Sequence, residues 1–208
     1  MALKAPTWRT EKAFWREGHL RVAGVDEVGR GPLAGPVVAG AVVLPQSRAK
    51  GVRALRDSKM LTAAAREELA AEIRERADWG IGIVSPQVID QINILRATRL
   101  AMRRAVLAIA PLPDLVLVDA FRIPNLPLAQ RGVLHGDRRC TAIAAASIVA
   151  KVTRDRAMLA YHSSDPRYGY DRHKGYATAD HLAALALHGY SALHRRSFRP
   201  QSLFDTME

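Results

Sequence analysis

The sequence predicts an α/β fold in which helices cover a mixed sheet. Strand-length apolar runs rich in Val and Ala recur along the chain, and segments with apolar residues at helical spacing lie between them. The stretch Val22–Val43 holds two such runs separated by Gly and Pro, which is typical of neighbouring antiparallel strands. A chain of 208 residues can bury one main core, so we expect a single domain over residues 1–208.

The elements follow from local patterns in chain order. Residues 1–21 mix basic residues with three aromatics, and we expect an N-terminal arm whose aromatics pack onto the domain, although they could instead stack on bases. The segment after Thr62 is rich in Ala, Glu and Arg, and Thr62 suits an N-cap. Pro86 opens a second helix, and the prolines at 111 and 113 end it.

These patterns fix the expected bounds. The predicted strands are Val22–Asp26, Val37–Leu44, Trp79–Val84, Asp114–Asp119 and Arg131–Leu134. The predicted helices are Thr62–Ala77, Pro86–Ala110, Arg138–Tyr161 and Ala179–His188. Small residues along one face of the third helix would let it pack closely on the sheet.

The composition favours a polyanionic partner. Lys and Arg number 31 against 20 Asp and Glu, for a net charge of +11, while the hydrophobic fraction of 49% is that of a folded protein. Nucleic acid is one such partner, but charge alone also permits membrane binding or simple solubility.

The compartment follows from cysteine usage and from the N-terminal segment. Cys140 is the only cysteine, so an intrachain disulfide is impossible and a secreted disulfide scaffold is excluded. The first 21 residues hold no apolar stretch long enough for a signal peptide or a membrane span. We therefore expect a cytoplasmic protein without membrane contact.

Carboxylates end two of the predicted strands. Asp26 and Glu27 close the first strand, and Asp119 closes the strand that starts at Asp114. Strand ends are where sites form in open α/β sheets. Burying two adjacent anions costs roughly several kcal/mol, which a divalent cation would offset. Taken alone, the Asp26–Glu27 pair fits a solvated acidic turn equally well.

Several other features admit a structural and a functional interpretation. The loop Pro166–Gly175 alternates aromatic and basic residues, which suits either a nucleic-acid surface or the edge of a core. Arg138 and Arg139 would oppose the dipole at the start of a helix, and a bound phosphate would explain them. His181 and His188 lack the spacing of a zinc site, so we interpret them as surface residues.

Five motifs together carry a resemblance. They are DEVGRGPLAGP at 26–36, DSK at 57–59, LVLVDA at 115–120, GDRRCTAIAAASIVAKVTRD at 136–155 and HKGYAT at 173–178. Over residues 22–198 the chain closely resembles the bacterial ribonuclease HII family, a type 2 RNase H. The resemblance implies an RNase H-like fold: a five-stranded mixed sheet, three antiparallel strands followed by two parallel ones, flanked by helices. It also implies a helical C-terminal extension at about 162–208.

The resemblance further implies an activity. Members are endoribonucleases that cleave the RNA of RNA–DNA hybrids, and that cut 5′ to single ribonucleotides embedded in duplex DNA, leaving 5′-phosphate and 3′-hydroxyl ends. Ribonucleotide removal from DNA would be the role. The cofactors would be Mn²⁺ or Mg²⁺, two per site, acting on the phosphodiester. We expect a monomer.

The implied site residues fall into two sets. The catalytic, metal-binding acids would be Asp26, Glu27, Asp119 and Asp137. The substrate-binding residues would be Gly29, Arg30, Gly31, Lys59, Lys151 and Tyr176. In this scheme the Gly-Arg-Gly loop contacts the ribose 2′-hydroxyl, the tyrosine packs on the adjacent sugar, and the lysines lie near phosphates.

The chain departs from the family pattern at four positions. The family has Lys at His135, serines at Cys140 and Ala142, and commonly Gly at Ala120. None of these departures removes a carboxylate, so they bear on substrate affinity rather than on the reaction class.

Other functions remain open at this point. The chain could be another two-metal nuclease on the same fold, or a binding protein that leaves hybrids intact. A nucleophilic Cys140 with His135 is a weaker alternative, because no orienting third residue is evident. Residues 201–204, Gln-Ser-Leu-Phe, faintly resemble a peptide that binds a sliding clamp.

Overall fold

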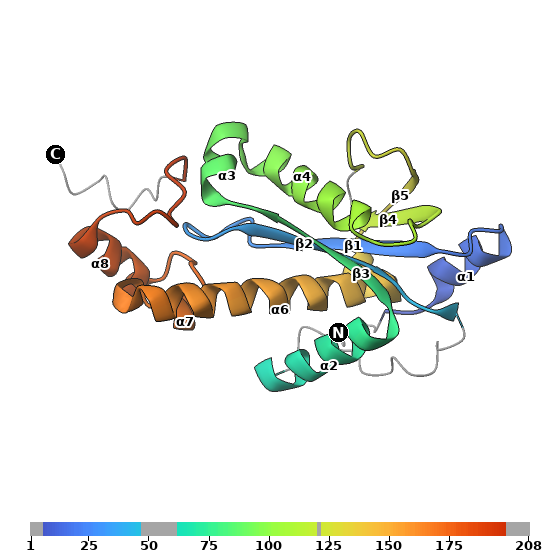
Figure 1. Cartoon of the computed structure of the whole chain (residues 1–208), viewed down its shortest axis with the longest axis horizontal. Helices are drawn as coiled ribbons and strands as arrows, with labels where there is room; N and C mark the ends of the chain where they lie inside the picture. The colour runs from blue at the N-terminus through green and yellow to red at the C-terminus, as the bar shows by residue number, and fades with distance from the viewer. Residues whose placement is uncertain (1–5, 47–61, 120–121, 199–208) are drawn as a thin grey trace.

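The computed structural model describes residues 6–46, 62–119 and 122–198. Five strands form one sheet in the order β3-β2-β1-β4-β5 (Figure 1). Their bounds are β1 Val22–Val28, β2 Val37–Val43, β3 Asp78–Val84, β4 Leu115–Asp119 and β5 Ala129–Val133. The last strand begins two residues before its predicted start, and the other strands lie within two residues of prediction.

The sheet is mixed in the predicted way. Strand β2 pairs antiparallel with both β1 and β3, whereas β4 pairs in parallel with β1 and with β5. Three antiparallel strands are thus followed by two parallel ones, which confirms the expected fold class. It also follows that β1, β3 and β4 run in one direction, so their carboxyl ends share one edge of the sheet.

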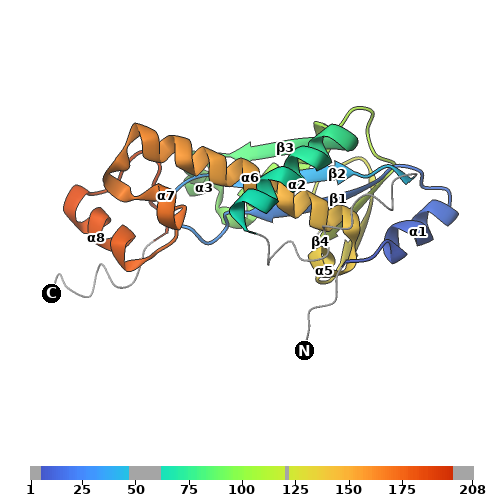
Figure 2. The same cartoon turned by 90° about the horizontal axis from the view of Figure 1, so that it is seen from below.

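Helices cover both faces (Figures 1 and 2). Helices α3 and α4 lie on one face, and the long α6 with α2 lies on the other. The helices are α1 Arg9–Arg16, α2 Ala63–Arg76, α3 Pro86–Ile92, α4 Ile94–Leu107, α5 Gly136–Arg139, α6 Thr141–Ser164, α7 Tyr170–His173 and α8 Ala179–His188, with a 3-10 turn η3 at Pro166–Tyr168. Among the described residues, no helix is long and apolar enough to cross a membrane.

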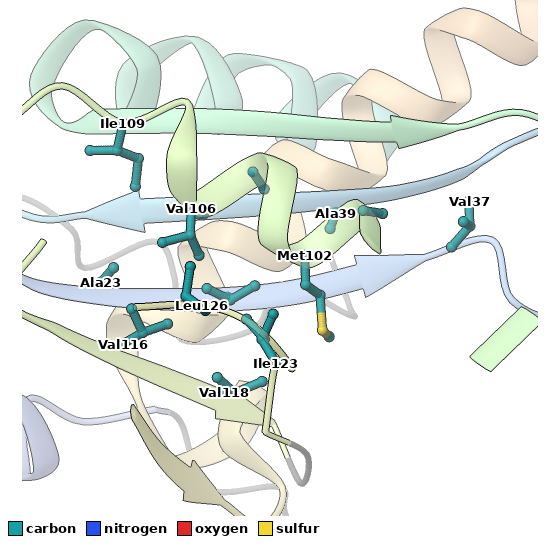
Figure 3. Close-up of a cluster of buried hydrophobic side chains, with 14 of the residues drawn as sticks. Ala23, Val37, Ala39, Met102, Val106, Ile109, Val116, Val118, Ile123 and Leu126 are labelled. Atoms are coloured by element: carbon teal, nitrogen blue, oxygen red, sulfur yellow. The ribbon is translucent and has the colours of Figure 1, made fainter. Parts of the chain in front are cut away.

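One core layer lies between α4 and the sheet (Figure 3). Met102 and Val106 of α4 are fully buried against strand residues such as Val116 and Val118. Ile123, from the loop after β4, joins the same layer. Apolar burial of this kind contributes about 1.5–3 kcal/mol for each large side chain, so α4 and this loop are held firmly on the sheet.

Close packing places α6 on the opposite face, as the small residues predicted. A Cβ added at Gly40 of β2 would lie 2.6 Å from the carbonyl oxygen of Ala146 and 3.3 Å from the Cβ of Ala150. Gly24 of β1 leaves even less room, because its Cβ would lie 2.1 Å from the carbonyl carbon of Ala142. The glycines therefore let the helix backbone approach the strands directly.

The prediction of one continuous helix over Pro86–Ala110 is wrong. It is two helices, separated at Asn93, whose φ of 65° lies in the left-handed region. The Asn93 side chain accepts a hydrogen bond from the backbone N–H of Arg96 at 3.1 Å and so caps α4. A residue that tolerates positive φ and also caps a helix explains the break.

The predicted start of the helix at Arg138 is also wrong. Gly136–Arg139 form the separate short helix α5, and the extended backbone of Cys140, with φ −118° and ψ 126°, divides it from α6. Arg138 and Arg139 therefore stand in the last turn of a helix, where positive charge is favourable. No bound phosphate is needed to explain them.

The N-terminal arm packs on the domain as expected. Phe14 and Trp15 of α1 contact the cluster around Leu117 and Ile143, and Trp8 packs against the α6 layer. Glu11 is buried, and its Oε1 accepts a hydrogen bond from the N–H of Ala142 at 2.9 Å, at the start of α6. Thr62 caps α2 as predicted, accepting from the N–H of Ala65 at 3.2 Å.

Candidate active site

Three carboxylates stand together at one edge of the sheet. Asp26 and Glu27 lie near the end of β1, and Asp119 is the last residue of β4. The parallel register pairs Val25 with Val118, so the next residues along each strand, Asp26 and Asp119, are neighbours. The sheet topology thus brings together acids that are far apart in sequence.

The electrostatics of Asp26 reflect this crowding. Burial, then the charge of Glu27 and to a lesser degree that of Asp119, raise the pKa of Asp26 to about 7. Hydrogen bonds from the Ser147 hydroxyl and from the N–H of Glu27, the latter at 2.9 Å, act in the opposite direction without cancelling the rise. A cation placed here would relieve the repulsion between the carboxylates.

The fourth predicted acid follows a tight turn. The N–H of Gly136 donates to Oδ1 of Asp119 at 3.1 Å, and Asp137 is the next residue, in the first turn of α5. A Cβ at Gly136 would meet the Cδ1 of Ile143 at 2.5 Å, so a larger residue there would require the Ile143 side chain to shift. The turn therefore ties the segment carrying Asp137 to Asp119.

Arg30 is bound to one of the acids. Its Nη1 lies 3.2 Å from Oε1 of Glu27, which is only 14% exposed. Arg30 was predicted to contact the substrate sugar, and its side chain is 42% exposed, so it is accessible from solvent. The ion pair joins the loop predicted to bind substrate directly to the acid cluster.

Two buried arginines, which the sequence analysis did not identify as site residues, hold the loop after β1. The guanidinium of Arg195 donates to the carbonyls of Gly29, Arg30 and Gly35, at 2.5, 2.9 and 2.9 Å. Arg154 of α6 donates to the carbonyls of Pro36 and Ala34 at 3.0 and 3.2 Å. Both arginines are 0% exposed. We call the loop 29–36 with these two side chains the arginine clamp.

Gly29 fits the clamp because it has no side chain. Its φ is 89°, and a Cβ there would lie 2.2 Å from Nε of Arg154. Gly31 is different, because a Cβ on it would meet only the Cε1 of Tyr176, at 3.9 Å. Tyr176 is 45% exposed and therefore lies beside the loop with its ring open to solvent.

The segment before Tyr176 is bonded to the same loop. The carbonyl of Gly175 accepts from the N–H groups of Leu33 and Ala34, at 2.8 and 3.3 Å. The tyrosine and the glycine loop, 145 residues apart between Gly31 and Tyr176, are thus held in one unit. Their predicted roles in binding substrate remain predictions.

The predicted contact of Lys151 with substrate phosphates remains a prediction. Lys151 of α6 pairs with Asp155 at 2.8 Å, one helical turn away. Lys59 lies outside the described residues, as do Ala120 and the segment 201–204. The sequence analysis did not identify Ser147 as a site residue. The available signal was its position on α6, one helical turn before the predicted substrate-binding residue Lys151.

The loop Pro166–Gly175 belongs to the core edge. Tyr168 and Tyr170 are 2% and 0% exposed and stack with their ring centroids 5.5 Å apart. The prediction that His181 lies on the surface is wrong: it is fully buried, and its Nε2 lies 3.1 Å from Nε2 of His194. His188 is exposed, as predicted. The amphipathic pattern of α8 was too short to show which histidine faces inward.

Cys140 is not an activated nucleophile. It is fully buried, and burial raises the pKa of its thiol to about 11. A thiol at that pKa is protonated at neutral pH. The alternative of a cysteine nucleophile is therefore unsupported.

The acids suit a hard divalent cation by ligand type. Carboxylate oxygens are the ligands that Mg²⁺ and Mn²⁺ prefer, and the charges of Glu27 and Asp119 raise the pKa of Asp26. Over residues 6–46, 62–119 and 122–198, no three His, Cys, Asp or Glu side chains already converge on one point. Glu27 is instead bonded to Arg30, and Asp119 to the Gly136 N–H. Side-chain rotations would be needed to gather the acids around an ion.

Residues 23–201 match the family model described as Ribonuclease HII. The chain belongs to the ribonuclease HII family. A Ribonuclease HII from Nitrosococcus oceani is 55% identical over 186 residues, covering 88% of this chain and 91% of that protein. The chain is accordingly a metal-dependent ribonuclease H, a hydrolase.

Solved structures agree on the fold. Ribonuclease H2 from Pyrococcus horikoshii matches with a TM-score of 0.71 at 27% identity, covering 86% of this chain and 94% of that one. RNase HII of Archaeoglobus fulgidus, in a PCNA:RNase HII complex, also gives 0.71, at 26% identity, covering 88% and 96%. The RNase H-like fold expected from the ribonuclease HII resemblance is thereby confirmed.

Proposed function

We propose that the chain is an endoribonuclease that cleaves the RNA strand of RNA–DNA hybrids and cuts 5′ to single ribonucleotides in duplex DNA. One observation carries the proposal. Two of the acids, Asp26 and Glu27, and the glycine loop are parts of one strand-loop segment, linked by the Arg30–Glu27 ion pair. Scissile phosphate and ribose must be bound a few atoms apart, which this arrangement permits.

The acids would bind the metal and orient the phosphodiester. Asp26, Glu27, Asp119 and Asp137 would be the ligands, with two Mn²⁺ or Mg²⁺ ions per site. Such ions, when bound, activate water and stabilise charge on the leaving 3′-oxygen, so that the products carry 5′-phosphate and 3′-hydroxyl ends. The Ser147 hydroxyl would keep the Asp26 carboxylate oriented through its hydrogen bond.

The glycine loop would supply ribose selectivity. The 2′-hydroxyl is the group that distinguishes a ribonucleotide from a deoxyribonucleotide at a given position. Gly31 has open space in front of its backbone, bounded by the Tyr176 ring, so a sugar could approach the backbone closely. Tyr176 would then pack on the next sugar. Arg30 would leave its ion pair with Glu27 and bind the substrate instead.

A cleavage assay tests the proposal. A labelled DNA duplex with one ribonucleotide is incubated beside an all-DNA duplex and an RNA–DNA hybrid, with Mg²⁺, Mn²⁺ or EDTA. We expect metal-dependent cutting 5′ to the ribonucleotide and within the hybrid, with the all-DNA duplex intact. Cutting of all three duplexes would favour a general two-metal nuclease, and no cutting with either metal would favour a binding protein.

We also propose a monomer whose residues 201–204 contact a sliding clamp. The support is the resemblance of Gln-Ser-Leu-Phe to a clamp-binding peptide, together with the Archaeoglobus fulgidus PCNA:RNase HII complex. Deleting residues 201–208 should abolish clamp binding in a pull-down while leaving cleavage of a short duplex intact. Unchanged clamp binding would reject this contact.

A further inference from the structure

A second basic site lies on α4, away from the acid cluster and the arginine clamp. It is a pocket of about 320 Å³. Its lining residues are Arg96, Arg99, Leu100, Arg103, Pro124 and Asn125. None of these residues is used by the proposed mechanism. We call it the α4 pocket.

The arginines of the α4 pocket are free to bind an anion. Spacings of three and four residues put Arg96, Arg99 and Arg103 on one face of the helix. Among the described residues, no carboxylate forms an ion pair with any of them. Nε of Arg99 is buried without a hydrogen-bond acceptor, which is costly unless a ligand supplies one.

Contacts within the protein hold the lining of the α4 pocket in place. Nε of Arg103 donates to the carbonyl of Asn125 at 3.0 Å, which fixes that guanidinium against the loop after β4. Ile123 and Leu126 anchor the same loop in the core beneath Met102 (Figure 3). A guanidinium held by its Nε leaves its two terminal nitrogens for a ligand.

The pocket lies on the side of the molecule where the acids lie. Helix α4 and the preceding α3 follow β3, whose carboxyl end shares an edge with those of β1 and β4, so Arg96 and Arg99 stand toward that edge. Pro124 and Asn125 belong to the connection that leaves Asp119 at the end of β4. A duplex bound at the acids could therefore extend to the pocket.

We propose that the α4 pocket binds a backbone phosphate of the duplex, away from the cleaved bond. The planar guanidinium matches two phosphate oxygens at once, and several such groups around one cavity suit a phosphate dianion or diester. The choice of a nucleic-acid phosphate rests on the proposed function. It gives the enzyme a contact that positions the duplex without reading its sequence.

Binding measurements test the site independently of cleavage. The duplex Kd is measured by fluorescence anisotropy in EDTA, at several salt concentrations, for Arg99→Gln and Arg103→Gln. Arg104→Gln is the matched control, because Arg104 is one residue further along α4, carries the same charge and bonds instead to the carbonyl of Ile83. We expect each pocket variant to raise Kd about 3- to 10-fold and to reduce the slope of log K against log salt by about 1, and the control to do neither.

A second experiment locates the phosphate. Neutral methylphosphonate linkages are placed one at a time along both strands, and Kd is measured for wild type and for Arg99→Gln. We expect one position at which the neutral linkage weakens wild-type binding but adds nothing to the Arg99→Gln defect. Strict additivity at every position, or an Arg99→Gln effect no larger than that of Arg104→Gln, would overturn the proposal.

Two further outcomes separate the possible explanations. If inorganic phosphate protects the pocket arginines from chemical modification while duplex affinity is unchanged in both variants, the pocket binds a free anion and the duplex assignment is wrong. If the variants lose duplex affinity as expected but the wild type cuts no substrate, the pocket stands and the proposed function fails.

Discussion

The acid cluster and the arginine clamp are adjacent but solve opposite electrostatic problems. Asp26 is a half-buried acid whose pKa is raised to about 7 by burial and by the negative charges of Glu27 and Asp119. Arg195 is a buried cation that three carbonyls satisfy, although burial and the nearby Arg154 still lower its pKa to about 9. The charge of Arg195 is thus compensated by hydrogen-bond acceptors within the protein, whereas among the described residues no cation compensates the charge of Asp26.

The difference separates a binding centre from a scaffold. A site that must accept cations keeps its anions incompletely compensated, whereas a loop that must hold its shape satisfies its backbone groups internally. Changes in the acid cluster should therefore affect activity more than folding. Changes in the clamp should affect folding of the loop first and activity as a consequence.

The largest expected effect comes from Asp26→Asn. If Asp26 is a metal ligand, as proposed, removing its charge should lower the cleavage rate by at least about 10³-fold, equivalent to roughly 4 kcal/mol of transition-state stabilisation. The melting temperature in EDTA should stay the same or rise, because repulsion from Glu27 and Asp119 is removed. Added Mn²⁺ should raise the melting temperature of the wild type but not of the variant.

Two results for Asp26→Asn would contradict this contrast between the acid cluster and the arginine clamp. Retention of full activity in Asp26→Asn would reject the metal assignment. A large loss of melting temperature in EDTA would show that the acid cluster, like the clamp, holds the fold together.

Arg195→Gln should be the most damaging change to the scaffold. It leaves the carbonyls of Gly29, Arg30 and Gly35 without their donor, and a buried acceptor left unsatisfied costs about 1–3 kcal/mol. The free energy of unfolding, measured with urea, should fall by that order. The exposed neighbour gives the control: Arg196→Gln should change it by less than about 0.5 kcal/mol. Equal small effects in both variants would mean that the clamp does not hold the loop.

A pair of glycines in the same loop separates folding from binding. Gly29→Ala combines a φ of 89° with a clash against Arg154, and should destabilise the protein by about 1–3 kcal/mol. Gly31→Ala meets only the Tyr176 ring at 3.9 Å and should leave unfolding nearly unchanged, while raising KM for a single-ribonucleotide duplex. An unchanged KM in Gly31→Ala would count against close approach of the sugar at this loop.

The smallest expected effect is the pH dependence of stability that comes from His194, the residue before Arg195. Burial, and then the neighbouring His181, lower the pKa of His194 from 6.5 to about 4. The unfolded chain therefore takes up a proton that the folded chain refuses, so stability is full above pH 6.5 and falls as the pH drops towards 4. The contribution of His194 to the loss at pH 5 should be on the order of 1–2 kcal/mol, whereas Asp26, whose pKa is raised to about 7, adds stability over the same range.

Thermal unfolding at pH 7 and pH 5 measures this effect. Between pH 7 and pH 5, His194→Gln should lose less stability, or gain more, than the wild type, and His188→Gln, at an exposed position on α8, should show the wild-type change. A wild-type change in His194→Gln would assign the pH dependence to other groups.

The sequence by itself predicted the local elements and the candidate acids at the strand ends. Apolar runs ended by Asp26 and Asp119 predicted strands, and the Ala- and Glu-rich segment after Thr62 predicted a capped helix, because these signals depend on residues close together in the chain. The five sequence motifs predicted membership of the ribonuclease HII family. The break at Asn93 and the division at Cys140 were missed, since single residues there override an otherwise helical pattern.

Only the tertiary structure decided which charges are buried and which residues meet. Arg195 follows His194 and precedes Arg196 and Ser197, a run of polar residues with no apolar pattern, yet it is fully buried because the loop after β1 offers it three carbonyls. His181 faces inward for a similar reason, as His194 approaches it from another segment. Such partners are distant in sequence, and no local pattern encodes a contact that exists only when the sheet has assembled.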